Sequence, residues 1–84
     1  MRIVKYSLND TYCIYIEERS PNSWAVTYAG MCMSQGGSWE YERMPSNRTE
    51  DFIQEFRFSN PESARDTYLH VGRTKLKING EFPS

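Results

Sequence analysis

The first half of the chain alternates apolar and polar residues with a period of two, which predicts β-strands. In the range 11–18, for example, Tyr12, Ile14 and Ile16 occupy every second position and share one face. Four segments show this alternation: 1–6, 11–18, 23–34 and 38–44. Turn-forming residues separate them, the strongest being Gly36-Gly37, and Gly30 predicts a bulge inside the third strand. Short strands joined by tight turns predict a four-stranded antiparallel meander.

After Pro45 the pattern becomes helical. Asn47 followed by Glu50 resembles a capping box, with Asn47 as the N-cap, and predicts a helix over 49–56. An extended alternative for 49–58 stays open, because every second residue from Phe52 to Phe58 except Gln54 is a phenylalanine. A second helix is predicted to begin at Asn60-Pro61 and to end at Gly72.

The last part of the chain returns to the strand pattern. Residues 73–79 place threonine, leucine and isoleucine on one side and cations on the other, which predicts an edge strand blunted by lysines. Residues 80–84 are expected to form a loose tail. Together, residues 1–84 predict a single α+β domain. We expect a four-stranded antiparallel meander packed by two short helices on one face, with a C-terminal edge strand.

Composition limits the classes of function. The 84 residues carry a formal net charge of -1, so no whole-chain field draws the protein to nucleic acid or to an anionic membrane. No apolar run approaches the roughly 20 residues of a membrane-spanning helix, and the N-terminus lacks the apolar core of a signal peptide. We therefore expect a cytoplasmic protein in which Cys13 and Cys32 are reduced.

Few residues in the sequence favour catalysis or metal binding. His70 is the single histidine, and the two cysteines lie far apart with no second pair that would complete a zinc site. Glu40 and Glu42 share a strand face, which is typical of the solvated side of an antiparallel sheet. The sequence therefore predicts a protein that is not an enzyme and that has no metal site and no cofactor.

The stretch around the predicted hairpin resembles a known group of sequences. Residues 37–48 read Gly-Ser-Trp-Glu-Tyr-Glu-Arg-Met-Pro-Ser-Asn-Arg, and Asp51-Phe52-Ile53 and Arg57-Phe58 continue the pattern. This pattern resembles short uncharacterised proteins of bacteria and their phages. The resemblance covers about a quarter of the chain and implies a bacterial or phage origin. It carries no assigned chemistry, and no functional residue is transferred from it.

Aromatic residues make up 14% of the chain, and a sheet with helices on one face leaves some of them exposed. We expect these rings, with adaptable methionines, to bind another protein. The candidate partner-binding residues are Trp24, Tyr28, Met31, Met33, Trp39, Tyr41 and Arg43. By analogy with small phage proteins, we expect the partner to be a host protein that this chain inhibits.

Two alternatives stay open. The first is a single-stranded nucleic-acid-binding domain that stacks bases on the sheet aromatics and contacts phosphates through Arg73, Lys75 and Lys77. The second is a structural module that forms a homodimer through the edge strand.

Overall fold

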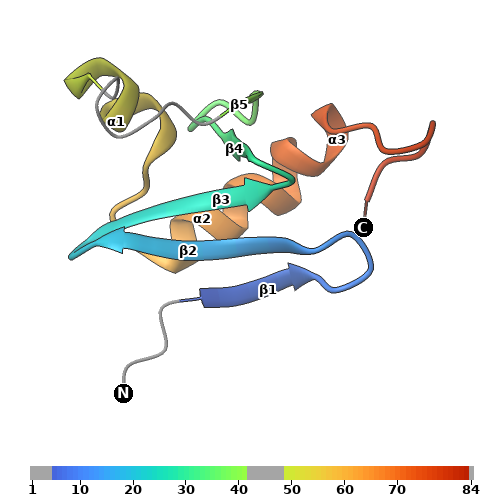
Figure 1. Ribbon diagram of the computed structural model, residues 1–84, viewed down its shortest axis with the longest axis horizontal. Helices are drawn as coiled ribbons and strands as arrows, with labels where there is room; N and C mark the ends of the chain where they lie inside the picture. Colours follow the sequence, from blue (N-terminus) through green and yellow to red (C-terminus); the bar gives the residue numbers. More distant parts are fainter. Residues whose placement is uncertain (1–4, 42–48, 84) are drawn as a thin grey trace.

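A computed structural model describes residues 5–41 and 49–83 of the chain. Its antiparallel strands follow one another across a single five-stranded sheet in the order β1-β2-β3-β4-β5 (Figure 1). The strands are β1 (Lys5–Asn9), β2 (Ile14–Ser20), β3 (Ser23–Tyr28), β4 (Met31–Met33) and β5 (Trp39–Tyr41). The helices are α1 (Glu50–Phe56), α2 (Pro61–Thr67) and α3 (Arg73–Lys75), with a π-helical turn at Tyr68–Gly72. The α+β class and the antiparallel sheet are confirmed.

The predicted long strand over 23–34 is in fact a hairpin. Tyr28 pairs with Met31, and the two residues between them, Ala29 and Gly30, have φ angles of +47° and +83°. Positive φ at both central positions is the geometry of a tight hairpin turn whose twist matches that of the strands. The prediction of a bulge at Gly30 was therefore wrong, and the break it marks creates β4 as a separate strand.

The C-terminal edge strand predicted for 73–79 was also wrong, because the helix continues through Gly72 into α3. Gly72 has helical angles, φ −57° and ψ −44°. A glycine inside a helix costs only about 1 kcal/mol relative to alanine, so it does not have to end the helix. Here its missing side chain has a packing role, since a Cβ at Gly72 would overlap the sulfur of the buried Met33.

The chain turns back on itself after α3. Asn79 and Gly80 have φ angles of +51° and +84°, and Ile78 and Glu81 on either side exchange two backbone hydrogen bonds of 2.7 and 2.9 Å. Ile78 and Pro83 are buried, whereas Phe82 is exposed. The end of the described chain thus contributes side chains to the core.

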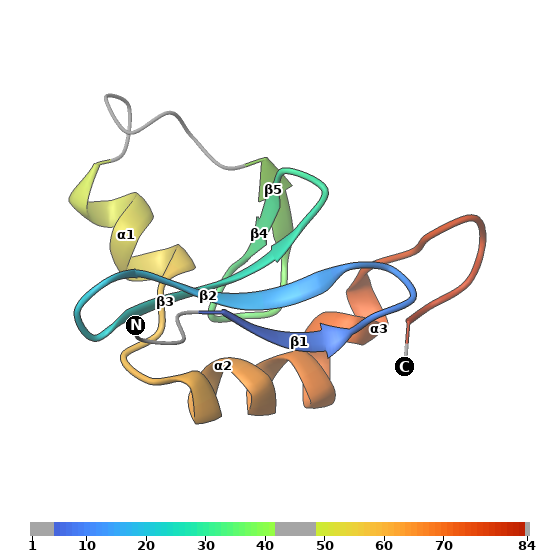
Figure 2. The ribbon, with the colours of Figure 1, turned by 60° about the horizontal axis from the view of Figure 1, so that its bottom comes forward.

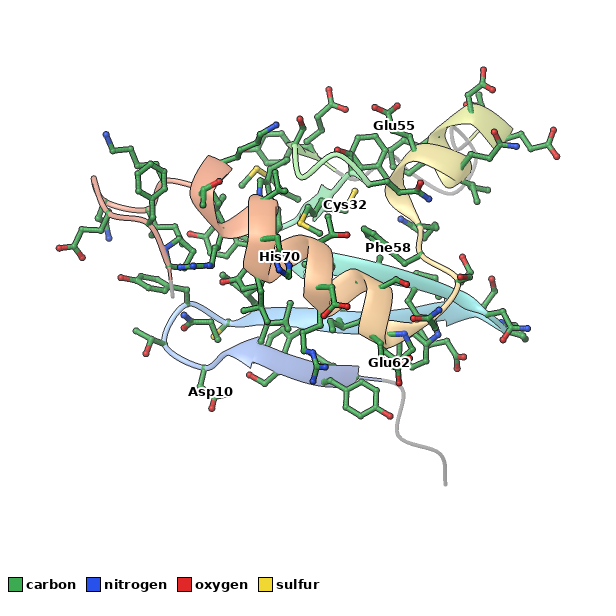
Figure 3. The ribbon with its side chains drawn as sticks, turned by 180° about the vertical axis from the view of Figure 1, so that it is seen from behind. Asp10, Cys32, Glu55, Phe58, Glu62 and His70 are labelled. Atoms are coloured by element: carbon green, nitrogen blue, oxygen red, sulfur yellow. The ribbon has the colours of Figure 1, made fainter. Side chains whose placement is uncertain are left out.

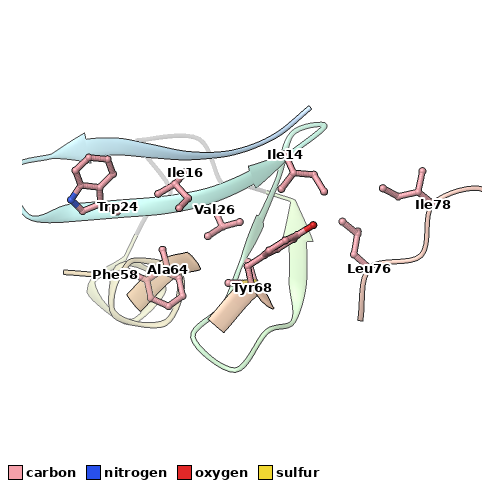
Figure 4. Close-up of a cluster of buried hydrophobic side chains, with 10 residues drawn as sticks. Ile14, Ile16, Trp24, Val26, Phe58, Ala64, Tyr68, Leu76 and Ile78 are labelled. Carbon is pink, nitrogen blue, oxygen red and sulfur yellow. The ribbon is translucent and has the colours of Figure 1, made fainter. Parts of the chain in front are cut away.

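The two main helices lie on opposite faces of the sheet, not on one face as predicted (Figure 2). Met33 of β4 belongs to the core cluster that includes Ala64 and Tyr68, whereas its neighbour Cys32 packs with Phe52 and Phe56 of α1. Adjacent residues of a strand point to opposite faces, so α2 and α1 cover different sides. The larger cluster brings together Ile14, Ile16, Trp24, Val26, Phe58, Ala64, Tyr68, Leu76 and Ile78 (Figure 4).

A short connection carries the chain from one face to the other. Phe58, just after α1, exchanges backbone hydrogen bonds of 2.7 and 2.8 Å with Trp24 at the start of β3. In the described chain β3 pairs with β4 only at its far end, through Thr27 and Tyr28, so β4 does not reach Trp24 and Phe58 pairs there in its place. The chain passes through that position, and α2 then begins beneath the sheet.

Both helix starts are capped by side chains. The hydroxyl of Thr49 accepts a hydrogen bond from the Phe52 N–H at 3.2 Å, and Phe52 and Phe56 are buried, so the helical prediction is confirmed over the extended alternative. Asn47, which the sequence pattern predicted as the cap, lies outside the described residues. Asn60 caps α2 as predicted, with its Oδ1 accepting from the Ser63 N–H at 2.8 Å.

Candidate partner-binding site

The strand β1 forms one edge of the sheet, and among the described residues it pairs only with β2. Its register is regular from Lys5, opposite Glu17, to Ser7, opposite Tyr15, and an irregularity follows between Ser7 and Asn9. In an edge strand, alternate N–H and C=O groups have no strand partner on the outer side. Lys5–Ser7 therefore offers a short, regular edge on which another strand can pair.

A cleft of about 380 Å³ lies directly beside this edge, between β1 and the start of α2. It is lined by Tyr6, Ser7, Leu8, Ile16, Pro61, Glu62 and Arg65. Ile16 is buried and Leu8 is half-buried against the core, so the floor of the cleft is apolar. Figure 3 shows Glu62 at the end of α2 that lies next to the start of β1.

Local sequence signals explain how each wall forms. Asn60 caps α2, and Pro61 occupies the first turn, where its fixed φ suits a helix start and where its missing N–H costs nothing. Glu62 and Arg65 are three residues apart, a spacing that places them on the same side of the helix. The helix start therefore presents one apolar ring and two opposite charges to the cleft.

The other wall is held in place by aromatic stacking. The ring of Tyr6 lies 5.7 Å from that of Trp24, with 29° between their planes. Trp24 is buried, whereas 46% of Tyr6 remains exposed. A ring that is already stacked loses little side-chain entropy when a ligand covers it, so Tyr6 is well suited to contact a partner.

The opposite face of β1 and β2 is polar. The ammonium of Lys5 lies 4.1 Å from the centre of the Tyr15 ring, and the hydroxyl of Thr27 donates to Glu17 at 2.6 Å. The pKa of Tyr15 lies above its ordinary value, first because of its hydrogen bond with Cys13 and then because of charge repulsion from the same cysteine. Tyr15 thus stays neutral at pH 7, and this face of β1 and β2 carries polar contacts where the cleft face carries apolar ones.

Five of the predicted partner-binding residues make core contacts: Trp24, Met33 and Trp39, and the half-buried Tyr28 and Met31. Trp24 and Met33 are buried. The indole Nε1 of Trp39 donates to the carbonyl of Gly72 at 2.9 Å, and the ring meets that of Tyr68 edge to face at 6.4 Å. Trp39 therefore fixes β5 to the end of the π-helical turn.

The turn beside Trp39 is fixed from both sides as well. The backbone N–H of Gln35 donates to the backbone carbonyl of Glu55 in α1 at 2.8 Å, and its side-chain amide donates to the Arg57 carbonyl at 2.7 Å. On the other side, Gly37 lies against Val71. The hairpin is a junction between helices from both faces of the sheet.

Tyr28 and Met31 also form a row with Tyr41 on one face of the sheet. Tyr28 pairs with Met31, and Met31 pairs with Tyr41, so their side chains are cross-strand neighbours. Tyr41 is 77% exposed. Arg43 lies outside the described residues. This row ends at β5, at the opposite edge of the sheet from the cleft, and a binding role for it stays a prediction.

The cations of the nucleic-acid alternative do not form the predicted strand row. Arg73 and Lys75 lie on α3, where the Arg73 Nε donates to the Leu69 carbonyl at 2.7 Å. The Lys75 Nζ lies 3.4 Å from the Gly36 carbonyl. Lys77 lies beyond α3, with its ammonium 6.0 Å from the centre of the Phe82 ring.

The residues considered for catalysis or metal binding are dispersed. His70 lies on the outer side of its helix, with its Nδ1 2.7 Å from the Asp66 carbonyl (Figure 3). Cys13 is exposed, Cys32 is buried, and neither forms a disulfide. Within residues 5–41 and 49–83, no group of three or more His, Cys, Asp or Glu residues is placed to hold a metal ion. The described helices are all too short or too polar to cross a membrane.

Sequence reasoning did not find the cleft. The strand alternation around Tyr6 and the helix start at Asn60-Pro61 were both recognised, but neither signal says that α2 begins beneath the edge at β1. That placement depends on the crossing at Phe58, which is a long-range contact. Comparisons with protein-family models, curated proteins and solved structures gave no match.

Proposed function

We propose that this protein is a small protein-binding module that takes up an extended segment of its partner along β1. The observation that carries the proposal is the coincidence of an open strand edge with an apolar cleft on the same side of the molecule. In strand addition, main-chain hydrogen bonds to the edge give affinity, and pockets for alternate side chains give specificity. Lys5–Ser7 would supply the edge, and the space between Tyr6 and Pro61 would receive the side chains.

The size of the site indicates a modest affinity. Its volume of about 380 Å³ lies near the lower end of the roughly 300–1,000 Å³ range of ligand sites. Full burial of one leucine or phenylalanine contributes about 1.5–3 kcal/mol, and association itself costs at least about 4 kcal/mol. Two apolar side chains contribute about 3–6 kcal/mol, and the few hydrogen bonds of a short ladder contribute about 1 kcal/mol each. After the cost of association, the binding free energy is no stronger than about −6 kcal/mol, which corresponds to a dissociation constant of tens of micromolar or weaker.

The partner that we propose is a host protein, in keeping with the resemblance of residues 37–48 to bacterial and phage sequences. Holding a segment that the host protein needs for its own contacts would inhibit that protein. Neither step requires a cofactor or a catalytic residue of this chain.

The test begins with peptides selected from a displayed random library against the immobilised full chain. A selected peptide is then remade with N-methyl groups at single positions, which remove one N–H donor at a time. In strand addition only every second N–H faces the edge, so we expect binding losses at alternate positions. Equal losses at all positions, or none, would contradict strand addition.

A matched pair of variants locates the site. Tyr6→Ala removes the exposed wall of the cleft, whereas Tyr41→Ala removes an equally large ring at the opposite edge of the sheet. We expect Tyr6→Ala to weaken peptide binding at least tenfold, the equivalent of about 1.4 kcal/mol, and Tyr41→Ala to leave it unchanged. The reverse result would place the binding site at β5 and refute the cleft.

A further inference from the structure

We propose that the cleft has a resident occupant, the β1 strand of a second copy of this chain, so that the unliganded protein is a two-fold symmetric dimer that a partner must open. This inference rests on the proposed function, because it uses the same edge and the same cleft. It adds that β1 of a second copy competes with the partner for the cleft, so that dimerisation regulates partner binding.

The strand β1 has the pattern that the cleft requires of a ligand. Tyr6 and Leu8 face the cleft, while Lys5 lies over Tyr15 on the polar face. A second β1 running antiparallel would therefore present an apolar ring to the cleft side and a polar residue to the other side. With the two-fold axis at Tyr6, Lys5 of each copy pairs opposite Ser7 of the other, and the regular part of the edge is fully used.

The charges at the cleft are self-complementary. A two-fold interface brings the same patch of both copies together in opposite directions, so each residue meets a different residue of the patch. Figure 2 shows that α2 runs in the same direction as β1, and it packs under β2 and β3. Two antiparallel β1 strands therefore place the two α2 helices antiparallel on the same face of the joined sheet, across the two clefts from each other. Glu62 of each copy is then opposite Arg65 of the other. The cleft carries one exposed charge of each sign, as such an interface needs.

The same structure keeps this dimer weak. The irregularity between Ser7 and Asn9 ends the regular edge after three residues, and bulges of this kind limit pairing at sheet edges. A short ladder can therefore exchange with a foreign strand. It follows that peptide binding becomes weaker as the protein concentration rises, since each dimer closes two clefts.

The test is sedimentation velocity of the full chain over a concentration series, with charge variants on the exposed side of α2. Arg65→Glu makes both positions acidic, and Glu62→Arg makes both basic, so each single variant should weaken the dimer about tenfold or more. An equimolar mixture of the two single variants should associate again, and the double variant should form a homodimer of nearly wild-type strength. Glu55→Arg on α1, on the opposite face, is the charge control and should have no effect.

Circular dichroism of each variant separates loss of association from loss of fold, since Glu62 also lies in the first turn of α2, where a negative charge stabilises the helix. A wild-type chain that stays monomeric at all concentrations would overturn the inference, as would a dimer that the charge variants leave unchanged. If that monomer still binds selected peptides with alternate N-methyl sensitivity, the proposed function stands without the dimer. If it neither dimerises nor binds peptides at β1, both fail.

Discussion

Gly37 is a position where the fold requires a residue without a side chain. Its φ is +88°, a conformation that L-residues with a side chain rarely adopt. A Cβ built there would lie 2.6 Å from Cγ1 of Val71 and 3.2 Å from the backbone nitrogen of Gly72. The second of these atoms belongs to the helix backbone and has little freedom to move. Gly37→Ala therefore combines backbone strain with overpacking.

The two contributions can be estimated and separated. A left-handed backbone at a residue with a Cβ costs about 1–2 kcal/mol, and overpacking costs about 1–3 kcal/mol. A gain of about 0.4–1 kcal/mol from the stiffer unfolded chain opposes them. Gly30→Ala is the matched control, because Gly30 has a nearly equal φ of +83° and no atom within 4 Å of its added Cβ. Gly37→Ala should thus be more destabilising than Gly30→Ala by about 1–3 kcal/mol.

The assay is equilibrium unfolding in urea, followed by the fluorescence of Trp24 and Trp39. A domain of 84 residues is expected to have a free energy of unfolding of about 4–12 kcal/mol, so a difference of this size shifts the midpoint clearly. Equal destabilisation by the two substitutions would refute the close approach of the β4–β5 turn to the helix. The hairpin would then not be the junction described above.

Three further predictions concern the stability of the fold. Met33→Ala, at a fully buried position, should lower the free energy of unfolding by about 2–5 kcal/mol, whereas Met31→Ala, at a half-buried one, should cost less than half as much in the same urea assay. Thr49→Ala should cost about 1 kcal/mol by removing the cap of α1, and Thr49→Ser should restore most of it. Burial raises the pKa of Tyr68 above its ordinary value of 10.0, an effect that Arg73 offsets only in part, so the folded state holds this proton more tightly than the unfolded chain does. The contribution of this proton to the free energy of unfolding is complete below pH 10 and is lost as the pH rises through the folded-state pKa. The wild type should therefore lose more stability between pH 9 and 11 than Tyr68→Phe. Equal dependence of the free energy of unfolding on pH in the two proteins would contradict this assignment.

The local pattern predicted most of the elements but not their arrangement. Alternation identified the strand around Ile14 and Ile16, and the cap and proline at Asn60-Pro61 identified the start of α2. Two errors in the predicted elements came from glycines, because a glycine is compatible with a bulge, a turn, a helix end or close packing inside a helix. Gly30 was interpreted as a bulge and is part of a turn, and Gly72 was interpreted as a helix end and is a packing position against Met33.

The candidate site was harder to predict for a related reason. Aromatic residues in strands are equally suited to a core and to an exposed platform, and the sequence does not say which face a helix will cover. Trp24 and Trp39 have core contacts because α2 and the π-helical turn lie against them. Tyr6 keeps an exposed ring because it lies on an edge strand. The sequence did not indicate its role because its neighbours, such as Trp24, come from distant parts of the chain.

Binding of a partner strand between β1 and α2 would give intermolecular nuclear Overhauser effects between a selected peptide and the isotope-labelled protein. We expect contacts from the peptide to the side chains of Tyr6, Leu8 and Pro61. We also expect cross-strand contacts from the peptide backbone to Lys5–Ser7. Contacts to Tyr41 and Met31 in their place would contradict binding at this site.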